Sequence, residues 1–190
     1  MKSVVSAVVA ILWLAASVVL VAQAKSDADV YAVLFGLSYH GVPGSRLAAQ
    51  DVAIPMPTIA VPGAVAQWLA QFDEMPGALR RAVSEPEPTT AALLDAAAFP
   101  PETRLVSRQA VQSLFTGGIE EGWARFRRQY ASEGFLAVSQ VLYSADALDA
   151  IVYYNVACGG LCGEGGYLWL HRNTARSPWV VAKKIVSMMA

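Results

Sequence analysis

Residues 151–171 read IVYYNVACGGLCGEGGYLWLH and contain both cysteines of the chain, Cys158 and Cys162. Two strand-like runs flank the cysteine loop, Ile151–Ala157 and Tyr167–Arg172, each rich in β-branched and aromatic residues. The spacing of three residues between the cysteines matches a short hairpin loop. The stretch therefore predicts an antiparallel hairpin that a disulfide between Cys158 and Cys162 closes.

The register of this hairpin sorts its side chains into two faces. Symmetric pairing places Cys158 opposite Cys162 and Asp149 opposite His171, and successive side chains alternate between faces. The more aliphatic face is predicted to pack under helices and holds Val152, Tyr154, Val156, Cys158, Leu168 and Leu170. The other face is aromatic and half-polar, and it is predicted to be partly exposed. It forms either a candidate binding surface or a solvated face without function, and it holds Ile151, Tyr153, Asn155, Tyr167, Trp169 and His171.

The disulfide is predicted to be structural. A loop this small loses little chain entropy, so the bridge should contribute roughly 2 kcal/mol to stability. Its main effect is to hold the register, because a slip of one residue would exchange the two faces. A redox role is the weaker alternative, since redox-active pairs have two residues between the cysteines at a helix N-terminus, whereas a strand follows here.

Period-two runs indicate two more strands, Phe135–Tyr143 and Trp179–Ser187. All connections in this third of the chain are short, and a parallel crossover needs about a dozen residues or more. A four-stranded antiparallel meander is therefore expected. Gly163, Gly165 and Gly166 resemble a phosphate loop only superficially, because no helix follows them, and they are expected to serve turns and close strand approach.

Helical spacing and capping residues dominate the earlier part of the chain, and Leu47–Val61 is proline-rich and predicted to be at most an edge strand or extended loop. The fold class is α+β, with N-terminal helices packed on the meander in a single domain over residues 25–190. The predicted helices are Asp27–His40, Ala64–Phe72, Pro76–Val83, Ala91–Ala98, Arg108–Leu114 and Ile119–Ala131.

The N-terminus predicts export. Residues 3–24 carry no charge, and Ala22-Gln23-Ala24 gives the small-x-small pattern that precedes a cleavage site. Residues 1–24 are thus predicted to be a signal peptide, with an uncleaved membrane anchor as the alternative. Membrane contact is expected only if residues 3–24 remain. In both cases the rest of the chain is expected outside the cytoplasm, in the periplasm or beyond, where disulfides persist.

Composition argues against several function classes. Fourteen basic residues balance fifteen acidic ones for a formal net charge of −1, so a basic patch for nucleic acid is not expected. The two histidines, His40 and His171, lack the ligand spacing of a zinc site, and no cofactor motif is present. The partner is therefore left open.

The hairpin and the strand after it, with Trp179-Val180-Val181 at its start, resemble a C-terminal module of exported bacterial proteins of unknown function. That module combines a strand, CGxLCG, an aromatic strand and a closing W-x-V strand, and the resemblance covers roughly residues 104–190. The chain departs from it at Arg176-Ser177-Pro178, where a basic-Gly-basic turn is expected. The resemblance implies export and a disulfide, and it implies no activity.

Two functions remain at this point. The first is an exported, non-catalytic domain that binds a partner through its aromatic sheet face. The alternative is a cell-envelope hydrolase that uses His171 and Asp149, which the predicted register brings together as half of a catalytic triad. No serine or cysteine in a strained nucleophile turn accompanies this pair, so a cross-strand surface pair is the simpler interpretation.

Overall fold

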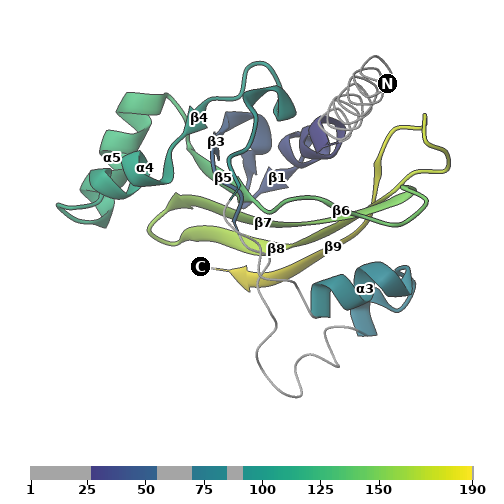
Figure 1. The fold of residues 1–190 in the computed structure, drawn as a ribbon. Helices are drawn as coiled ribbons and strands as arrows, with labels where there is room; N and C mark the ends of the chain where they lie inside the picture. Colours follow the sequence, from purple (N-terminus) through teal and green to yellow (C-terminus); the bar gives the residue numbers. More distant parts are fainter. Residues whose placement is uncertain (1–26, 55–69, 85–91, 190) are drawn as a thin grey trace, which may run out of the picture.

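The computed structural model describes residues 27–54, 70–84 and 92–189 of the chain (Figure 1). The predicted signal peptide or anchor lies outside these residues, as does most of the helix predicted over Ala64–Phe72. Residues 27–36 are helical. The other elements are β1 (Ser38–Tyr39), β2 (Val42–Pro43), β3 (Leu47–Gln50), α3 (Gly77–Ser84), β4 (Leu105–Val106), α4 (Arg108–Leu114), α5 (Ile119–Tyr130), β5 (Gly134–Val138), β6 (Leu142–Tyr143), β7 (Asp149–Gly159), β8 (Cys162–His171) and β9 (Val180–Met189), with short 3-10 helices at Gly44–Arg46, Ala70–Phe72 and Ala96–Ala98.

The main sheet is mixed and larger than predicted. Its described strands run in the order β4-β3-β5-β7-β8-β9, with β6 paired to β7 outside this path, which makes seven strands. Strands β5, β7, β8 and β9 are antiparallel neighbours, but β3 pairs in parallel with both β4 and β5. The α+β class is confirmed, whereas the four-stranded antiparallel meander is wrong as a description of the sheet.

Strand β3 was hidden from sequence reasoning by its composition. Its residues are Leu47-Ala48-Ala49-Gln50, and all of them are buried. A strand that is covered on both faces shows no alternation of polar and apolar residues, and alanine is depleted in strands. The expected edge strand or loop over Leu47–Val61 is therefore wrong for residues 47–50, which lie inside the sheet; residues 55–61 lie outside the described part.

Several predicted elements are shorter or interrupted. The helix expected to reach His40 ends at residue 36, and a two-strand hairpin follows with His40 and Gly41 at positive φ in its turn (48° and 80°). The run Phe135–Tyr143 forms two strands, β5 and β6. Of the helix expected over Ala91–Ala98, the described residues keep a 3-10 turn at Ala96–Ala98. Helices α3, α4 and α5 lie within a residue or so of their predicted ranges.

The β7–β8 hairpin has the predicted register along its length. Pairing runs from Asp149 opposite His171 to Ala157 opposite Gly163. At the tip the register shifts, so Gly159 pairs with Cys162 and the expected opposition of the two cysteines is wrong. A two-residue turn at positions 160 and 161 replaces the symmetric loop, because such turns match strand twist and a bulge absorbs the extra residue. The Cys158–Cys162 disulfide is present, with 5.1 Å between the two Cα atoms.

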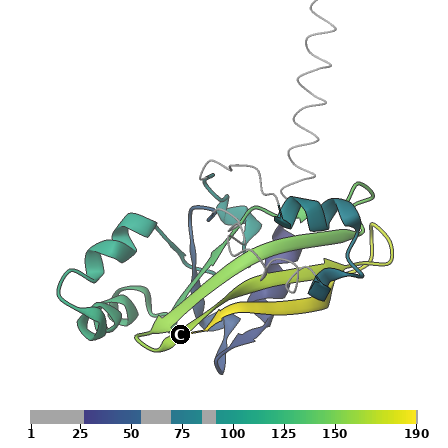
Figure 2. The same cartoon turned by 90° about the horizontal axis from the view of Figure 1, so that it is seen from below.

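Both faces of the sheet are covered. The helix of residues 27–36 packs on one face and α3 packs on the other (Figures 1 and 2). The first interface contains the predicted aliphatic face, which is confirmed as buried core: Val152, Tyr154, Val156, Cys158, Leu168 and Leu170. Helices α4 and α5 form a third cluster beside β3 and β4, in which Trp123 and Phe126 pack on Phe135.

Strand β9 stands at the end of the strand order and is irregular. Its pairing with β8 shifts register twice, between Gly165 and Gly166 and between Trp169 and Leu170. Gly166 lies at the first shift, where a Cβ atom would stand 2.1 Å from the carbonyl oxygen of Ile185. The expectation that these glycines permit close strand approach is therefore confirmed at Gly166.

We predict that Gly166→Ala lowers the free energy of unfolding by roughly 1–3 kcal/mol, because backbone must move to admit the new methyl group. Urea unfolding measures the difference. Gly36→Ala is the matched control, since no atom beyond its chain neighbours and its own helix backbone lies within 4 Å of the point where its new methyl group would stand, and alanine favours a helix over glycine. Equal losses in the two variants would contradict the close-approach explanation.

Candidate functional site

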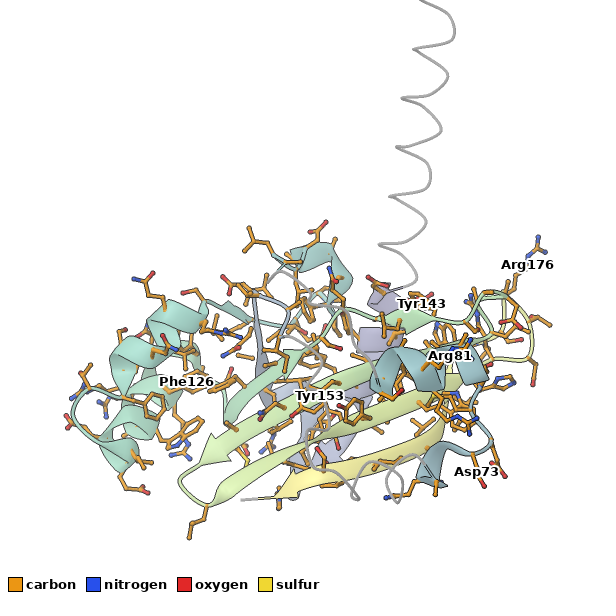
Figure 3. All side chains as sticks on the ribbon, turned by 60° about the horizontal axis from the view of Figure 1, so that its bottom comes forward. Asp73, Arg81, Phe126, Tyr143, Tyr153 and Arg176 are labelled. Atoms are coloured by element: carbon orange, nitrogen blue, oxygen red, sulfur yellow. A yellow bond between two sulfur atoms is a disulfide. The ribbon has the colours of Figure 1, made fainter. Side chains whose placement is uncertain are left out.

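The predicted binding face is covered in this structure. Tyr153, Tyr167 and Trp169 retain only 8%, 1% and 8% of their exposure, and the first two rings lie 5.0 Å apart. The residues that cover them are Met75, Leu79 and Val83 of α3 and its preceding turn. Figure 3 shows Tyr153 on this side of the sheet. The expectation of a partly exposed aromatic face is thus wrong, because a helix packs over it. Of the residues predicted for this face, only Asn155 and His171 keep partial exposure.

Asp149 and His171 meet across the hairpin as the register predicted. The His171 Nδ1 atom lies 3.0 Å from Asp149 Oδ1, and the indole Nε1 of Trp169 donates to the same oxygen at 2.8 Å. The serine hydroxyl nearest to them in sequence belongs to Ser144, whose Oγ donates to Asp146 Oδ1 at 2.6 Å and accepts from the Asp149 backbone N–H. These bonds hold the Ser144 hydroxyl within the turn before β7.

An ion pair between a buried carboxylate and a half-buried lysine lies on the opposite face of the same hairpin. Lys184 Nζ stands 2.6 Å from Glu164 Oε1, and Tyr154 Oη donates to that oxygen at 2.5 Å. The Glu164 side chain is only 8% exposed. The ammonium also lies 4.7 Å from the ring centroid of Tyr39, a distance at which a cation is attracted to the ring.

This cluster has the properties of a structural network. Burial, and next the neighbouring Glu164 carboxylate, raise the pKa of Tyr154, so its hydroxyl stays protonated and acts as a donor. Burial likewise raises the pKa of Tyr39. The carboxylate and the ammonium satisfy each other, and neither is left to act as a catalytic base or nucleophile. Sequence reasoning missed this pair because Glu164 stands among glycines and Lys184 stands in a strand with no sign of their contact.

A groove lies at the other end of the hairpin. It has a volume of about 550 Å³ and runs between the helix of residues 27–36 and the loop that joins β8 to β9. The helix contributes Asp29, Ala32 and Val33, and the opposite wall consists of Arg172 and residues 175–179. Figure 3 shows Arg176 projecting from this loop, away from the sheet.

Arg172 and Trp179 give the groove its rigid corner. The Arg172 guanidinium carbon lies 4.2 Å from the centroid of the Trp179 ring, and its Nε donates to the Ala147 carbonyl at 2.8 Å. Trp179 is 6% exposed, and its Nε1 atom is buried without a hydrogen-bond partner among the described residues. Neither groove arginine forms an ion pair with a carboxylate in the described part of the chain.

The first turn of the helix is tied to this corner. Tyr143 packs 6.1 Å from the Trp179 ring and its hydroxyl donates to Asp27 Oδ1 at 2.6 Å. Burial raises the pKa of the Asp27 carboxyl, and the bond from Tyr143 offsets part of that effect. The groove therefore has two walls that are held together at one end.

Sequence reasoning did not find the groove. Its residues come from two segments that are more than a hundred positions apart, and each segment alone looks like solvated surface. The one local signal was the departure at Arg176-Ser177-Pro178 from the turn of the resembling module.

Within the described residues, no three histidine, cysteine, aspartate or glutamate side chains gather closely enough to hold a metal ion. The same residues contain no helix that is long and apolar enough to cross a membrane. Comparisons with family models, with curated proteins and with solved structures found no match.

We predict that Lys184→Met lowers the free energy of unfolding by roughly 3–5 kcal/mol, because it leaves the buried Glu164 carboxylate without its counter-charge. The double variant Lys184→Met/Glu164→Gln should recover part of this loss, since the uncompensated charge is gone. Thermal and urea unfolding of the cycle measure the coupling.

Lys183→Met is the matched control, because this neighbouring lysine donates to the backbone carbonyl of Gln71 on the other face of the sheet. Its loss should be much smaller. A strictly additive double variant would show that the ion pair contributes no coupling energy.

Proposed function

We propose that the chain is an exported, non-catalytic binding domain whose ligand site is the groove between the helix of residues 27–36 and the β8–β9 loop. The observation that carries this proposal is the groove itself. Its volume of about 550 Å³ falls in the range of small-ligand sites. It combines apolar wall residues with two arginines that have no carboxylate partner among the described residues, and such a mixture of apolar surface and few polar anchors is typical of binding sites.

The proposed function is the one expected from the sequence, but the binding site is the groove and not the aromatic sheet face. A partner that used Tyr153, Tyr167 and Trp169 would first have to displace α3, and the apolar area buried there opposes that step. The groove needs no such displacement. It is therefore the better candidate for a binding site.

Export is supported by the disulfide, because such bonds persist in oxidising compartments. The intact mass of the protein recovered from the cell envelope tests it. We expect the mass of residues 25–190 less two hydrogen atoms. A mass that includes residues 1–24 would show the anchored form, and reduced cysteines in the recovered protein would argue against an oxidising location.

A cell-envelope hydrolase is the second candidate, and the 3.0 Å contact between His171 and Asp149 is the observation that favours it. The missing part is a nucleophile, since Ser144 is bonded within its turn. Labelling of a serine by a fluorophosphonate probe, lost in His171→Ala, would support this function over binding alone. Absence of labelling would remove it.

We predict that ligands from a fragment library shift the NMR signals of Ala32 and of residues 172–179, and that Ala32→Trp abolishes binding by filling the groove. Ala32 is exposed on the helix, so the variant should fold normally. Gly36→Trp places the same side chain at an exposed position of this helix outside the groove lining, and it should bind like the wild type. Shifts that cluster elsewhere, or that survive Ala32→Trp, would contradict the proposal.

A further inference from the structure

We infer that the groove is specific for an amphiphile with an oxyanion head, a phosphate or a carboxylate, whose head binds Arg172 and whose apolar part lies along Ala32, Val33 and Pro178. This inference rests on the proposed function, because it names the ligand class of the same site. It follows from the orientation of one arginine, the charge of the walls and the composition of the remaining lining.

Arg172 is held ready to bind an anion. Its Nε atom is bonded to the Ala147 carbonyl and its guanidinium lies over the Trp179 ring. The two terminal nitrogens of a guanidinium fixed in this way present donors in the fork that matches a carboxylate or phosphate. Because the side chain is already ordered, a ligand loses less free energy in fixing it than at a mobile arginine.

The groove also carries a surplus of positive charge on one side. Arg172 and Arg176 both lie on the loop wall, whereas Asp29, the single carboxylate among the described lining residues, lies on the helix wall. An anionic head is therefore attracted to the loop side and repelled from the helix side. This asymmetry sets an orientation for the ligand along the groove.

Trp179 supplies a spectroscopic signal beside the groove. Its indole Nε1 is a donor that has no partner in the described part of the chain, and a buried donor left unpaired destabilises a fold. Trp179 also lines the groove, and its ring lies against the Arg172 guanidinium, so an oxyanion bound there changes the surroundings of the indole. The indole N–H resonance of Trp179 should then report binding directly.

The remaining described lining is mostly apolar and selects against a bare inorganic anion; its one hydroxyl, that of Ser177, is hydrogen-bonded to Thr174 Oγ1 at 2.9 Å. Ala32, Val33 and Pro178 offer no hydrogen-bonding side chain, so each methylene group of an alkyl segment that is buried there adds to the affinity. An anion without such a segment would leave most of the groove unfilled. The ligand is thus expected to be amphiphilic.

Such an amphiphile can be a free molecule or a membrane lipid. Asp29 follows Ala24 by five residues, and five residues span at most about 18 Å of extended chain. If residues 3–24 remain uncleaved, the groove stays close to the bilayer surface and lipid head groups come within reach. The two sources share one chemistry, and the experiment has to separate them.

The test titrates the protein purified from the cell envelope with hexyl phosphate, hexanol, hexylamine and inorganic phosphate, and records the Trp179 indole N–H signal. Parallel sedimentation uses vesicles of phosphatidylglycerol or of phosphatidylcholine. We expect hexyl phosphate to bind more tightly than each of the other three soluble probes. Arg172→Met should weaken its binding roughly 10- to 100-fold, the loss of one charged hydrogen-bonding partner, and Arg172→Lys should restore only part of it.

Arg128→Met, which removes an exposed arginine of α5 outside the groove, is the control and should change nothing. Binding of hexyl phosphate without vesicle binding supports a soluble ligand. Sedimentation that depends on Arg172 and occurs with phosphatidylglycerol vesicles but not with phosphatidylcholine vesicles supports a lipid head group. Equal binding of hexanol, or binding that Arg172→Met leaves intact while Ala32→Trp abolishes it, overturns the inference but leaves the proposed binding function standing. The inference is also overturned if neither a soluble probe nor a vesicle binds, and the fragment screen then decides the proposed function separately.

Discussion

The antiparallel pairing of β7 with β8 is the interaction on which the rest of the structure depends. It is the longest pairing of the sheet, running from Asp149 and His171 at one end to Gly159 and Cys162 at the other. Because both faces of this hairpin are buried, it contributes core residues to the helix of residues 27–36 and to α3 alike. The two ends of the hairpin carry different features. At one end lies the disulfide, and Arg127 donates a hydrogen bond to the Cys158 carbonyl there. At the other end lies the groove with its stacked arginine.

The sequence predicted those parts of the fold that depend on residues close to one another in the chain. The cysteine spacing and the alternation of apolar residues predicted the register from Asp149 to Ala157. A capping serine before Arg108 predicted α4, and helical spacing of aromatic residues predicted α5. Strand β3 was not predicted because its four residues, two of them alanine, are all buried and show no alternation of polar and apolar side chains. The packing of α3 over Tyr153 could not be predicted, because the pattern of an amphipathic helix does not indicate which face of a sheet the helix packs on.

The groove was beyond prediction for a related reason. Arg172, Arg176 and Asp29 become neighbours only because the fold brings the end of β8 beside the helix of residues 27–36, and neither segment contains a motif. The Asp149–His171 pair shows the contrasting case. Cross-strand register alone placed these two side chains together, and the structure brings their atoms to 3.0 Å, but register could not reveal that Trp169 would share the same carboxylate oxygen.

The two register shifts of β9 have a consequence for how copies of this protein meet one another. An outer strand offers unpaired backbone groups to any other extended chain, and long regular edges of this kind promote aggregation. Between its shifts β9 keeps a regular ladder only from Lys183 to Val186, and both lysines of that stretch already have partners. A second chain therefore finds too short a template to extend the sheet, which favours separate molecules when the protein is concentrated.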